Sequence, residues 1–467
     1  MKRGLGRIAV ALCVLGGCGT DARVSDTDAD TSKIDVSDTH ESDTTESDTD
    51  GSDSRVSDTD GSDTLESDSR ESDTDVDDTR ESDVADTSPC AAPLPAPPSA
   101  ALRPVAGELF YAQLGLGGFK MGESALLVGP DGTSVLIDVG NDSHDDDVAE
   151  RVLALTGRSE VDHLVLTHFH GDHLGGLADL MGRIAVTRSI VHRGLTDLTA
   201  AANADTFDAL CTALAEHPAL AAPLCSASAP APCKASNRQG SYPAIACPGL
   251  TTFDVSLGGG ARMDFIAANG FMGDRQFTRD VGPMLGDDTN GENARSAVAV
   301  IAHGAFRMLV AGDLTGGGSD TDDLESFYVP GLDLAGISAR GVDVLHAGHH
   351  GRNTSTNATW ADRLLPRDGR DRNAVMGIST AHLLSPHAET LATLLDGDRL
   401  GQGRAWTTTV TVGGATAAGL VDAEGGMVLV ATLDGGAAYA VQAVDESGRV
   451  LESRVFRSVG STTAICP

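Results

Sequence analysis

The stretch Thr167-His168-Phe169-His170-Gly171-Asp172-His173-Leu174-Gly175-Gly176 decides the fold expected for this chain. It follows an apolar run and places three imidazoles and one carboxylate within six positions. Residues two apart in an extended segment point the same way, so His168 and His170 can bind one ion together. Asp172 and His173 begin the next element and can hold a second ion nearby. A polar loop that is merely rich in histidine is the alternative, but imidazole with carboxylate is the usual ligand set of zinc-like ions.

The flanking sequence predicts alternating strands and helices. Val161 to Leu166 has the composition of a strand, and Leu174 to Met181 that of the helix that follows it. Asp145 to Leu155 is predicted to be a helix, because its three leading acids lie where the helix dipole favours negative charge. Such alternation predicts an α/β layered fold.

The H-x-H-x-D-H order resembles the metallo-β-lactamase superfamily, and the flanking sequence resembles its ComEC-type, competence-related hydrolases. The resemblance covers roughly Glu108 to Thr409. It implies a four-layer αββα sandwich with metal ions at one edge, between the sheets. A strand, a Gly-rich loop and a hairpin that ends in Asp138-Val139-Gly140 also match the opening of those hydrolases. The chain departs from them at Gln113 to Gly115, where they usually carry an aspartate.

The resemblance implies a ligand set for two divalent ions, zinc or manganese. The third histidine that many relatives supply to metal one is not identifiable, and His192 is the only candidate. The expected ligands are His168 and His170 for metal one, Asp172, His173 and His349 for metal two, and Asp313 for both.

Two of these assignments have open alternatives. Asp313 ends a hairpin as Gly-Asp does in the family, and a plain turn aspartate is its alternative. His349 and His350 precede a glycine as in the family's second-metal motif. His349 is expected to be the ligand and His350 to face substrate or to support a ligand, and the reverse assignment is the alternative. Asp172 is expected to position the attacking hydroxide or to protonate the leaving group, and with His350 completes the catalytic pair.

Five further residues are expected to support the ligands or contact substrate. Asp138 either orients a ligand histidine through its free ring nitrogen or binds backbone amides at a strand end. Asn293 and Ser296 stand at the entrance of the hairpin that leads to the bridging aspartate. Arg352 is expected to neutralise substrate charge, and His387 either contacts the site or caps a helix.

The N-terminus resembles a bacterial lipoprotein signal. A basic start and an apolar run from Ile8 to Leu15 close in Leu15-Gly16-Gly17-Cys18, and Cys18 would carry the lipid. The run is too short for a permanent membrane span. A cleaved signal peptide is the alternative. Gly19 is not the aspartate that typically retains lipoproteins at the inner membrane, which favours the outer membrane.

The composition divides the chain into expected parts. Asp21 to Cys90 contains 25 acidic and 5 basic residues with few large apolar ones, so we expect a disordered tether. The predicted parts are a signal at 1–18, an acidic linker at 19–104, a hydrolase domain at 105–412 with an insertion at about 200–250, and a small β-rich C-terminal appendage at 413–467.

Six cysteines remain outside the signal and lipidation positions. An even number in an exported protein suggests disulfides, and their pairing is not fixed by sequence. We expect Cys90 to pair with Cys466 and the other pairs to form locally between Cys211 and Cys247.

These features favour a membrane-anchored hydrolase of phosphodiester bonds that uses a metal-bridging hydroxide, as in the ComEC-type relatives. Amide or ester hydrolysis of the lactamase or lactonase type, an extracellular nuclease, and a non-catalytic metal-binding surface protein are the alternatives. Residues 91–467 carry 43 acidic and 25 basic residues, which disfavours long nucleic acid. A small or envelope-bound phosphodiester is the expected partner, with membrane contact through the lipid alone. A DNA-uptake channel is disfavoured, since no run of eighteen apolar residues follows the signal.

Overall fold

Strands from both ends of the folded region meet in one β-sheet of the computed structural model. The structure describes residues 93–116, 122–195, 204–227, 245–273, 277–278, 289–333, 335–367, 377–378, 385–396, 399–400, 404–411 and 413–461. The sheet has nine strands in the order β21-β20-β19-β1-β2-β3-β4-β5-β6. They are β1 (Phe110–Gln113), β2 (Ala125–Val128), β3 (Ser134–Ile137), β4 (Glu160–Leu166), β5 (Ala185–His192), β6 (Ala221–Pro223), β19 (Met427–Leu433), β20 (Ala438–Val444) and β21 (Val450–Arg457).

A seven-stranded sheet packs against the first one. Its order is β12-β11-β10-β13-β14-β15, and β9 also pairs with β10. Apolar side chains from the facing surfaces of both sheets form one buried cluster. The strands are β9 (Asp254–Gly258), β10 (Ala261–Ala268), β11 (Phe271–Met272), β12 (Phe277–Thr278), β13 (Val298–His303), β14 (Phe306–Val310) and β15 (Val344–Leu345).

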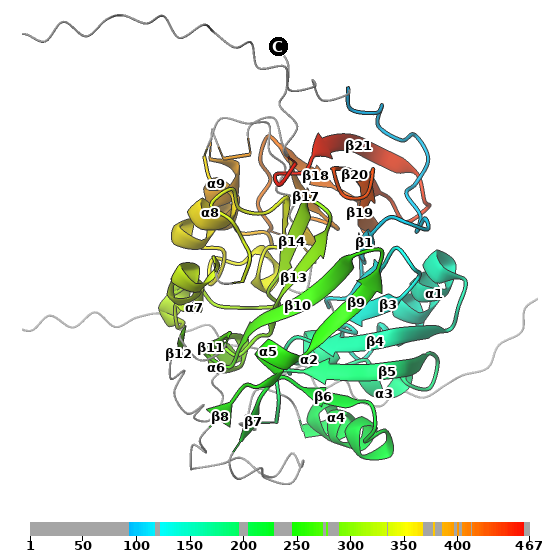
Figure 1. The fold of residues 1–467 in the computed structure, drawn as a ribbon, viewed down its shortest axis with the longest axis vertical. Helices are drawn as coiled ribbons and strands as arrows, with labels where there is room; N and C mark the ends of the chain where they lie inside the picture. The colour runs from blue at the N-terminus through cyan, green and yellow to red at the C-terminus, as the bar shows by residue number, and fades with distance from the viewer. Residues whose placement is uncertain are drawn as a thin grey trace, which may run out of the picture. The chain divides into compact units, whose positions relative to one another are not determined.

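Helices cover the outer face of each sheet, and each helical layer has its own apolar cluster. Figure 1 shows α7, α8 and α9 on one flank and α1, α3 and α4 on the other, with the sheets between them. The expected αββα sandwich is therefore confirmed. The helices are α1 (Asp145–Thr156), α2 (Gly171–Leu174), α3 (Leu177–Leu180), α4 (Ala204–Glu216), α7 (Leu324–Tyr328), α8 (Ala358–Leu364) and α9 (Ala388–Leu395).

Short elements complete the described chain. A three-stranded parallel sheet has the order β16-β17-β18, and a separate two-stranded sheet pairs β7 with β8. These elements are β7 (Ser226–Ala227), β8 (Ile245–Ala246), α5 (Gly249–Thr252), α6 (Thr289–Asn293), η1 (Gly318–Asp320), η2 (Val329–Gly331), η3 (His349–Gly351), β16 (Gly377–Ile378), β17 (Ala405–Thr407) and β18 (Leu420–Asp422). No helix among the described residues is both long and apolar enough to span a bilayer.

Helix α1 shows how sequence fixes one of these elements. Its first turn holds three aspartates, and Val148, Val152 and Leu155 are buried on the face that packs against the sheet. Gly157 ends the helix at φ 73°, where its N–H donates to Leu153 O. The helix predicted for Asp145 to Leu155 is confirmed.

The C-terminal strands belong to the sandwich, so the appendage expected at 413–467 is wrong. Strand β19 pairs antiparallel with β1, with Phe110 opposite Ala431. Val430 and Val441 pack in the cluster between the sheets. The strand pattern was visible in sequence, but its partner lies more than three hundred residues away, and local patterning carries no information about such pairing.

The insertion expected at about 200–250 is only partly separate from the sandwich. Helix α4 contributes Leu210 to the outer apolar cluster, and β6 extends the first sheet beside β5. Cys225 and Cys247 form a disulfide, as expected for a local pair, and Cys211 is also disulfide-bonded. The Cys90–Cys466 pair, the signal with Cys18, and residues 19–92 of the linker lie outside the described residues.

Candidate metal centre

Parallel strand pairs bring the predicted ligands to one edge of the sandwich. Strand β3 runs parallel to β4, and β14 runs parallel to β15. The carboxyl ends of parallel strands meet at the same edge of a sheet, so the residues that follow these strands converge. Asp138 follows β3, the His168–His173 stretch follows β4, Asp313 follows β14 and the His-His-Gly turn follows β15.

The first ligand cluster contains His168, His170 and Asp313. His168 Nε2 lies 3.0 Å from His170 Nδ1 and 3.6 Å from Asp313 Oδ2. The other ring nitrogen of His168 lies 3.1 Å from Thr167 Oγ1. Burial is the largest cause that lowers the pKa of His168 well below its usual value. The imidazole is therefore neutral, which is the form that can bind a metal ion.

The second cluster shares Asp313 with the first. His173 Nε2 is 3.2 Å from His350 Nε2 and 3.2 Å from Asp313 Oδ1. His350 Nε2 is also 3.2 Å from Asp172 Oδ2 and 3.4 Å from Asp313 Oδ2. The carboxylate of Asp313 thus faces both clusters at once, as expected for an aspartate that binds two ions.

Two buried carboxylates orient the imidazoles of the second cluster. Asp138 Oδ2 accepts from His173 Nδ1 at 2.8 Å, and Glu123 Oε2 accepts from His350 Nδ1 at 3.1 Å. The other oxygen of Glu123 lies 2.9 Å from His346 Nε2. These contacts fix the tautomer that turns each Nε2 toward the centre. Burial opposes protonation of His173, but Asp313 and Asp138 outweigh it and raise its pKa well above the usual value.

Asp138 makes both kinds of contact expected from sequence, one with a ligand histidine and one with a backbone amide. The carboxylate orients His173, and its Oδ1 also accepts from the backbone N–H of Thr167 at 2.8 Å. Asp138 has φ 56°, which costs a non-glycine residue about 1–3 kcal/mol. A buried residue held in this conformation by several contacts indicates a functional constraint.

The His-His-Gly turn places His350, rather than His349, in the second cluster. His349 and His350 have φ 50° and 55°, so both adopt the left-handed conformation. His349 Nε2 lies 3.3 Å from Asn293 Nδ2 and 3.8 Å from Asp313 Oδ2, and its Nδ1 contacts Thr354 Oγ1. The positions of the two histidines are therefore the reverse of those expected from sequence, because these backbone conformations rotate the two side chains.

His192 takes no part in either cluster formed by the described residues. Its Nδ1 accepts from Gly194 N–H at 3.2 Å, and its ring centroid lies 6.3 Å from that of Phe169. Burial, with a smaller contribution from Arg193, lowers the pKa of His192 to about 4. These contacts are those of a neutral structural histidine beside the His168–His173 stretch, which we call the metal loop.

The remaining predicted residues surround the clusters. Ser296 Oγ accepts from the backbone N–H of Asp313 at 3.2 Å. His387 N–H donates to Gly351 O at 2.9 Å, so His387 lies beside the His-His-Gly turn. His387 occupies the N-cap position of α9, but its side chain makes no capping hydrogen bond. Burial and then the charge of Arg352 lower the pKa of His387.

Sequence reasoning missed Glu123 and the buried pair formed by Arg193 and Glu292. Glu123 is 4% exposed and is separated from strand β2 by Ser124. An acid at the entry of an apolar strand was the available signal, because such a carboxylate needs a partner once buried. Arg193 and Glu292 are far apart in sequence, and nothing in their local patterns connects them.

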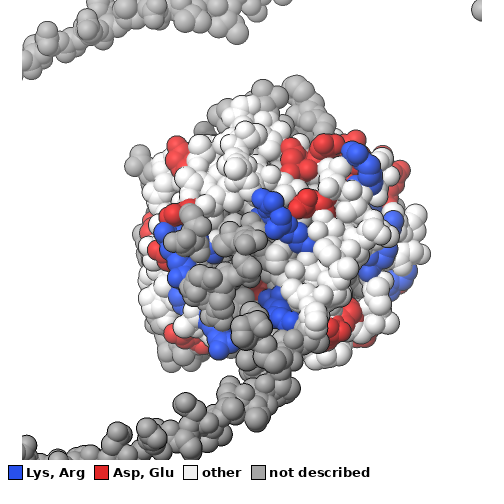
Figure 2. Space-filling model, turned by 90° about the horizontal axis from the view of Figure 1, so that it is seen from above, with Lys and Arg blue, Asp and Glu red and all other residues white. Residues whose placement is uncertain are grey.

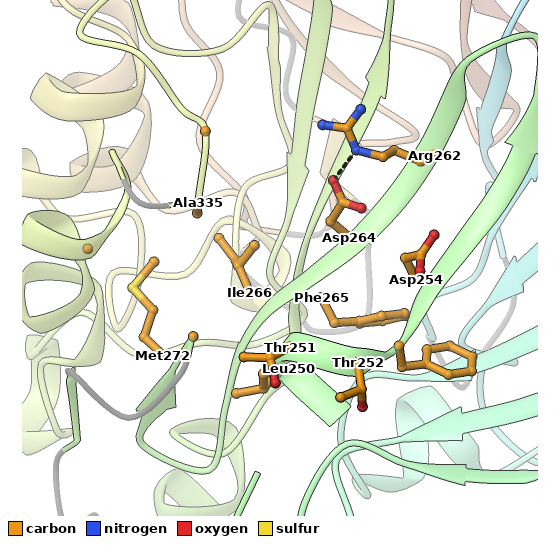
Figure 3. A pocket seen from close by; sticks show the side chains of 14 residues that line it. Leu250, Thr251, Thr252, Asp254, Arg262, Asp264, Phe265, Ile266, Met272 and Ala335 are labelled. Carbon is orange, nitrogen blue, oxygen red and sulfur yellow. Dashed lines mark hydrogen bonds and ion pairs between the residues drawn. The ribbon is translucent and has the colours of Figure 1, made fainter. Parts of the chain in front are cut away.

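A cavity of about 630 Å³ lies away from these clusters and contains none of the predicted site residues. Figure 3 shows its wall on β10, where Arg262 pairs with Asp264 at 2.6 Å, and Met272 across from Phe265. Cavity size therefore does not locate the centre. The convergence of imidazole and carboxylate groups does.

Comparisons with known proteins agree with the architecture around the metal loop. The family model of the metallo-beta-lactamase superfamily matches residues 119–207. No curated protein matches the chain at a significant level.

Three solved structures with similarity to this chain are beta-lactamases. A Cronobacter sakazakii (Enterobacter sakazakii) metallo-beta-lactamase with a HARLDQ motif is 15% identical, with 53% of this chain and 78% of that one covered and a TM-score of 0.27. The beta-lactamase from Chitinophaga pinensis is 16% identical, with 54% and 80% covered and a TM-score of 0.27. A subclass B3 enzyme from a soil metagenome library is 14% identical, with 54% and 81% covered and a TM-score of 0.27. At these values the specificity of those enzymes does not transfer to this chain.

The family match covers part of the centre, since Asp313 and His350 lie outside residues 119–207. Asp138 and the whole His168–His173 stretch lie within it. The part of the αββα sandwich formed by residues 119–207 is thus similar to the metallo-beta-lactamase superfamily.

Proposed function

We propose that the protein is a dinuclear metal-dependent hydrolase that acts on small or envelope-bound phosphodiesters. The observation that carries the proposal is the environment of Asp313. Its side chain is 1% exposed, and neither carboxylate oxygen accepts a hydrogen bond of normal geometry from the described residues. A buried carboxylate is costly unless positive charge neutralises it. Imidazole nitrogens of His168, His173 and His350 lie 3.6, 3.2 and 3.4 Å from its oxygens, so divalent ions fit the donor set.

Each ion is assigned its own residues. Imidazole suits zinc, and a larger share of carboxylate oxygen suits manganese, so both metals fit the donors. Two divalent ions would supply a water of lowered pKa and stabilise developing negative charge on the substrate. Metal one is assigned to His168 Nε2, His170 Nδ1 and Asp313, and metal two to Asp172, His173 Nε2, His350 Nε2 and Asp313.

The chain's own groups would bind substrate and move the proton. Asp172 Oδ2 lies beside His350 Nε2 at the edge of the second cluster, and it is assigned to carry a proton from water to the leaving group. His349 lies next to Asp313 and contacts Asn293, and neither residue belongs to a cluster, so both are assigned to contact substrate oxygens. This assignment gives His349 the substrate role that sequence gave to His350.

Unpartnered donors near the His-His-Gly turn support an anionic substrate. Among the described residues, Arg352 Nε and His387 Nε2 are buried atoms without a hydrogen-bond partner. A single phosphodiester charge can be met by such a pair together with the ions. An uncharged amide or ester substrate gives these two groups no equivalent role.

The overall charge argues against long nucleic acid as the substrate. Residues 91–467 carry 43 acidic and 25 basic residues, and binding of long nucleic acid depends on many Lys and Arg contacts to phosphates. Figure 2 shows basic and acidic side chains interspersed over one face, with neither sign forming an uninterrupted surface there.

Attachment to the cell envelope is a second part of the proposal. The motif that ends in Cys18 supports a lipid anchor, with the outer membrane as the favoured location. Cys18→Ser should move the protein from the membrane fraction to the soluble fraction while hydrolytic activity is retained. Wild-type protein in the soluble fraction would contradict the anchor.

The proposed activity is tested with a panel of substrates on the purified protein loaded with zinc or manganese. We expect turnover of bis(p-nitrophenyl) phosphate or p-nitrophenyl phosphorylcholine, with Arg352→Met raising KM for these anions. Turnover of a cephalosporin or a lactone instead would establish the amide or ester alternative. Rapid cleavage of single-stranded DNA at about 0.15 M salt, without turnover of small esters, would establish a nuclease. A metal content near zero after reconstitution would contradict a metal-dependent hydrolase and would indicate a structural protein.

A further inference from the structure

Phe169, the residue between the two histidines of the first cluster, is held through both its backbone and its ring. Its N–H donates to Glu292 Oε1 at 2.9 Å. Its ring lies 4.2 Å from the guanidinium carbon of Arg193. The phenyl group is 1% exposed, so these contacts are shielded from water. The conformation of the backbone between His168 and His170 therefore depends on Glu292 and Arg193.

Glu292 and Arg193 form a fully buried, forked ion pair. Arg193 Nε and Nη2 each donate to a different carboxylate oxygen of Glu292 at 2.7 Å, and both side chains are 0% exposed. Arg193 Nη1 also donates to Asn269 Oδ1 at 3.2 Å, while Asn269 Nδ2 donates to Arg193 O at 2.7 Å. Such a bidentate arrangement fixes the orientation of both groups.

A buried ion pair is seldom needed for stability alone, since a well-packed apolar pair of the same volume often does as well. A single backbone N–H also needs only one neutral acceptor. The hydrogen bond from Phe169 therefore does not by itself explain why two charged groups are buried here. The ion pair is better explained by a role in fixing the position of Glu292.

The first cluster needs such a device because its imidazoles lack the carboxylates that orient the second cluster. His170 Nε2 has no hydrogen-bond partner among the described residues. His168 Nδ1 lies 3.1 Å from the hydroxyl of Thr167. The backbone that carries these rings therefore has a larger part in placing them than it has in the second cluster.

The disulfide-bonded segment anchors the other side of the pair. Gly194 follows Arg193 at φ 105°, and a Cβ there would lie 2.1 Å from Cys225 O. The backbone after Arg193 is thus in direct contact with the segment that the Cys225–Cys247 bond closes.

We propose that Glu292, held by Arg193, is the positioning residue of the first half of the centre. By fixing the N–H of Phe169 it sets the separation and angle of His168 Nε2 and His170 Nδ1, and so the affinity of that half for its ion. The ion itself rests on the proposed function, whereas the control of the loop by the pair does not.

The first test is Glu292→Gln, which keeps the shape and an acceptor for Phe169 but leaves Arg193 unpaired. We expect faster hydrogen exchange of the Phe169 amide in the metal-free protein. In zinc titrations with a competing chelator, affinity for one of the two ions should fall about 10–100-fold, with the other ion unchanged. The absorption spectrum of the cobalt-loaded protein should change for one ion only.

Because an unpaired buried arginine destabilises the fold, a second variant combines Glu292→Gln with Arg193→Met. This variant buries no net charge, and we expect it to fold and still to bind one ion more weakly than wild type. Asp343→Asn is the matched control. Asp343 is also a buried carboxylate that accepts from a backbone N–H, that of Arg307, at 2.8 Å. It does not belong to the metal loop. The control substitution should lower stability without selective loss of an ion.

Two results would overturn the positioning role. One is wild-type affinity for both ions in the double variant. The other is an Asp343→Asn protein with the same selective loss of one ion. A wild-type protein that binds two ions but hydrolyses no ester would refute the proposed activity and leave the positioning role intact. A wild-type protein that binds no ion, with unchanged Phe169 exchange in both Glu292 variants, would refute both.

Discussion

The two halves of the centre are stabilised in different ways. In the second half, Asp138 and Glu123 accept directly from the ring nitrogens of His173 and His350. In the first half no carboxylate among the described residues plays that part, and Glu292 accepts from the backbone of Phe169 instead.

The electrostatics of the halves differ accordingly. The pKa of His168 is lowered by burial, whereas for His173 and His350 nearby carboxylates outweigh burial and raise it. We therefore expect metal uptake in the second half to displace protons, while the first half offers an imidazole that is already neutral. A single sequence stretch thus supplies two half-sites with different chemistry.

The largest effect should come from Asp313, because both halves share it. Asp313→Ala should weaken both ions and lower kcat/KM by more than about 100-fold, since each ion supplies several kcal/mol of transition-state stabilisation. Metal content and steady-state kinetics measure both outcomes. Loss of only one ion would show that Asp313 does not bridge the halves.

The next largest effect separates His350 from His349. His350→Ala removes a nitrogen that faces His173, so it should release one ion and reduce kcat strongly. His349→Ala should retain both ions and mainly raise KM. Elemental analysis of the two variants decides the order, and release of an ion from the His349→Ala protein alone would restore the assignment made from sequence.

Smaller, selective effects are expected from substitution of the two carboxylates that accept from the histidine rings of the second half. Asp138→Asn and Glu123→Gln should each lower affinity for the ion of the second half by about 10–100-fold, because the ring orientation is lost. Chelator competition measures this loss, with the first ion as the internal standard. Equal weakening of both ions would mean that the halves are not independently supported.

The smallest effect on the centre should come from His192. Its folded pKa of about 4 lies below the usual 6.5, so the folded state keeps this ring neutral. Its contribution to stability is complete above pH 6.5 and is lost as the pH falls toward 4, about 3 kcal/mol in total. His192→Gln should show a weaker loss of unfolding free energy over this range than wild type, as measured by urea unfolding. A lowered zinc affinity in this variant would instead make His192 a ligand.

Much of the centre was predictable because its ligands are local in sequence. The His168–His173 stretch and the strand before it predicted both the metal loop and its place in an α/β sandwich. Asp138 and Asp313 were predictable because each ends an apolar strand. Local order could not choose between His349 and His350, since the choice depends on two successive left-handed conformations in the turn.

The sequence by itself determined the donor types, the alternation of strands and helices, and the unequal charge of the tether and the folded region. Only the tertiary structure decided which distant groups support those donors. Glu123, Arg193 and Glu292 come from separate segments, and burial beside the ligands gives them their roles. The same holds for β19, which pairs with β1 across the length of the folded region. Pairings of this kind depend on the whole fold, because they are set by which surfaces are buried together and not by any local pattern.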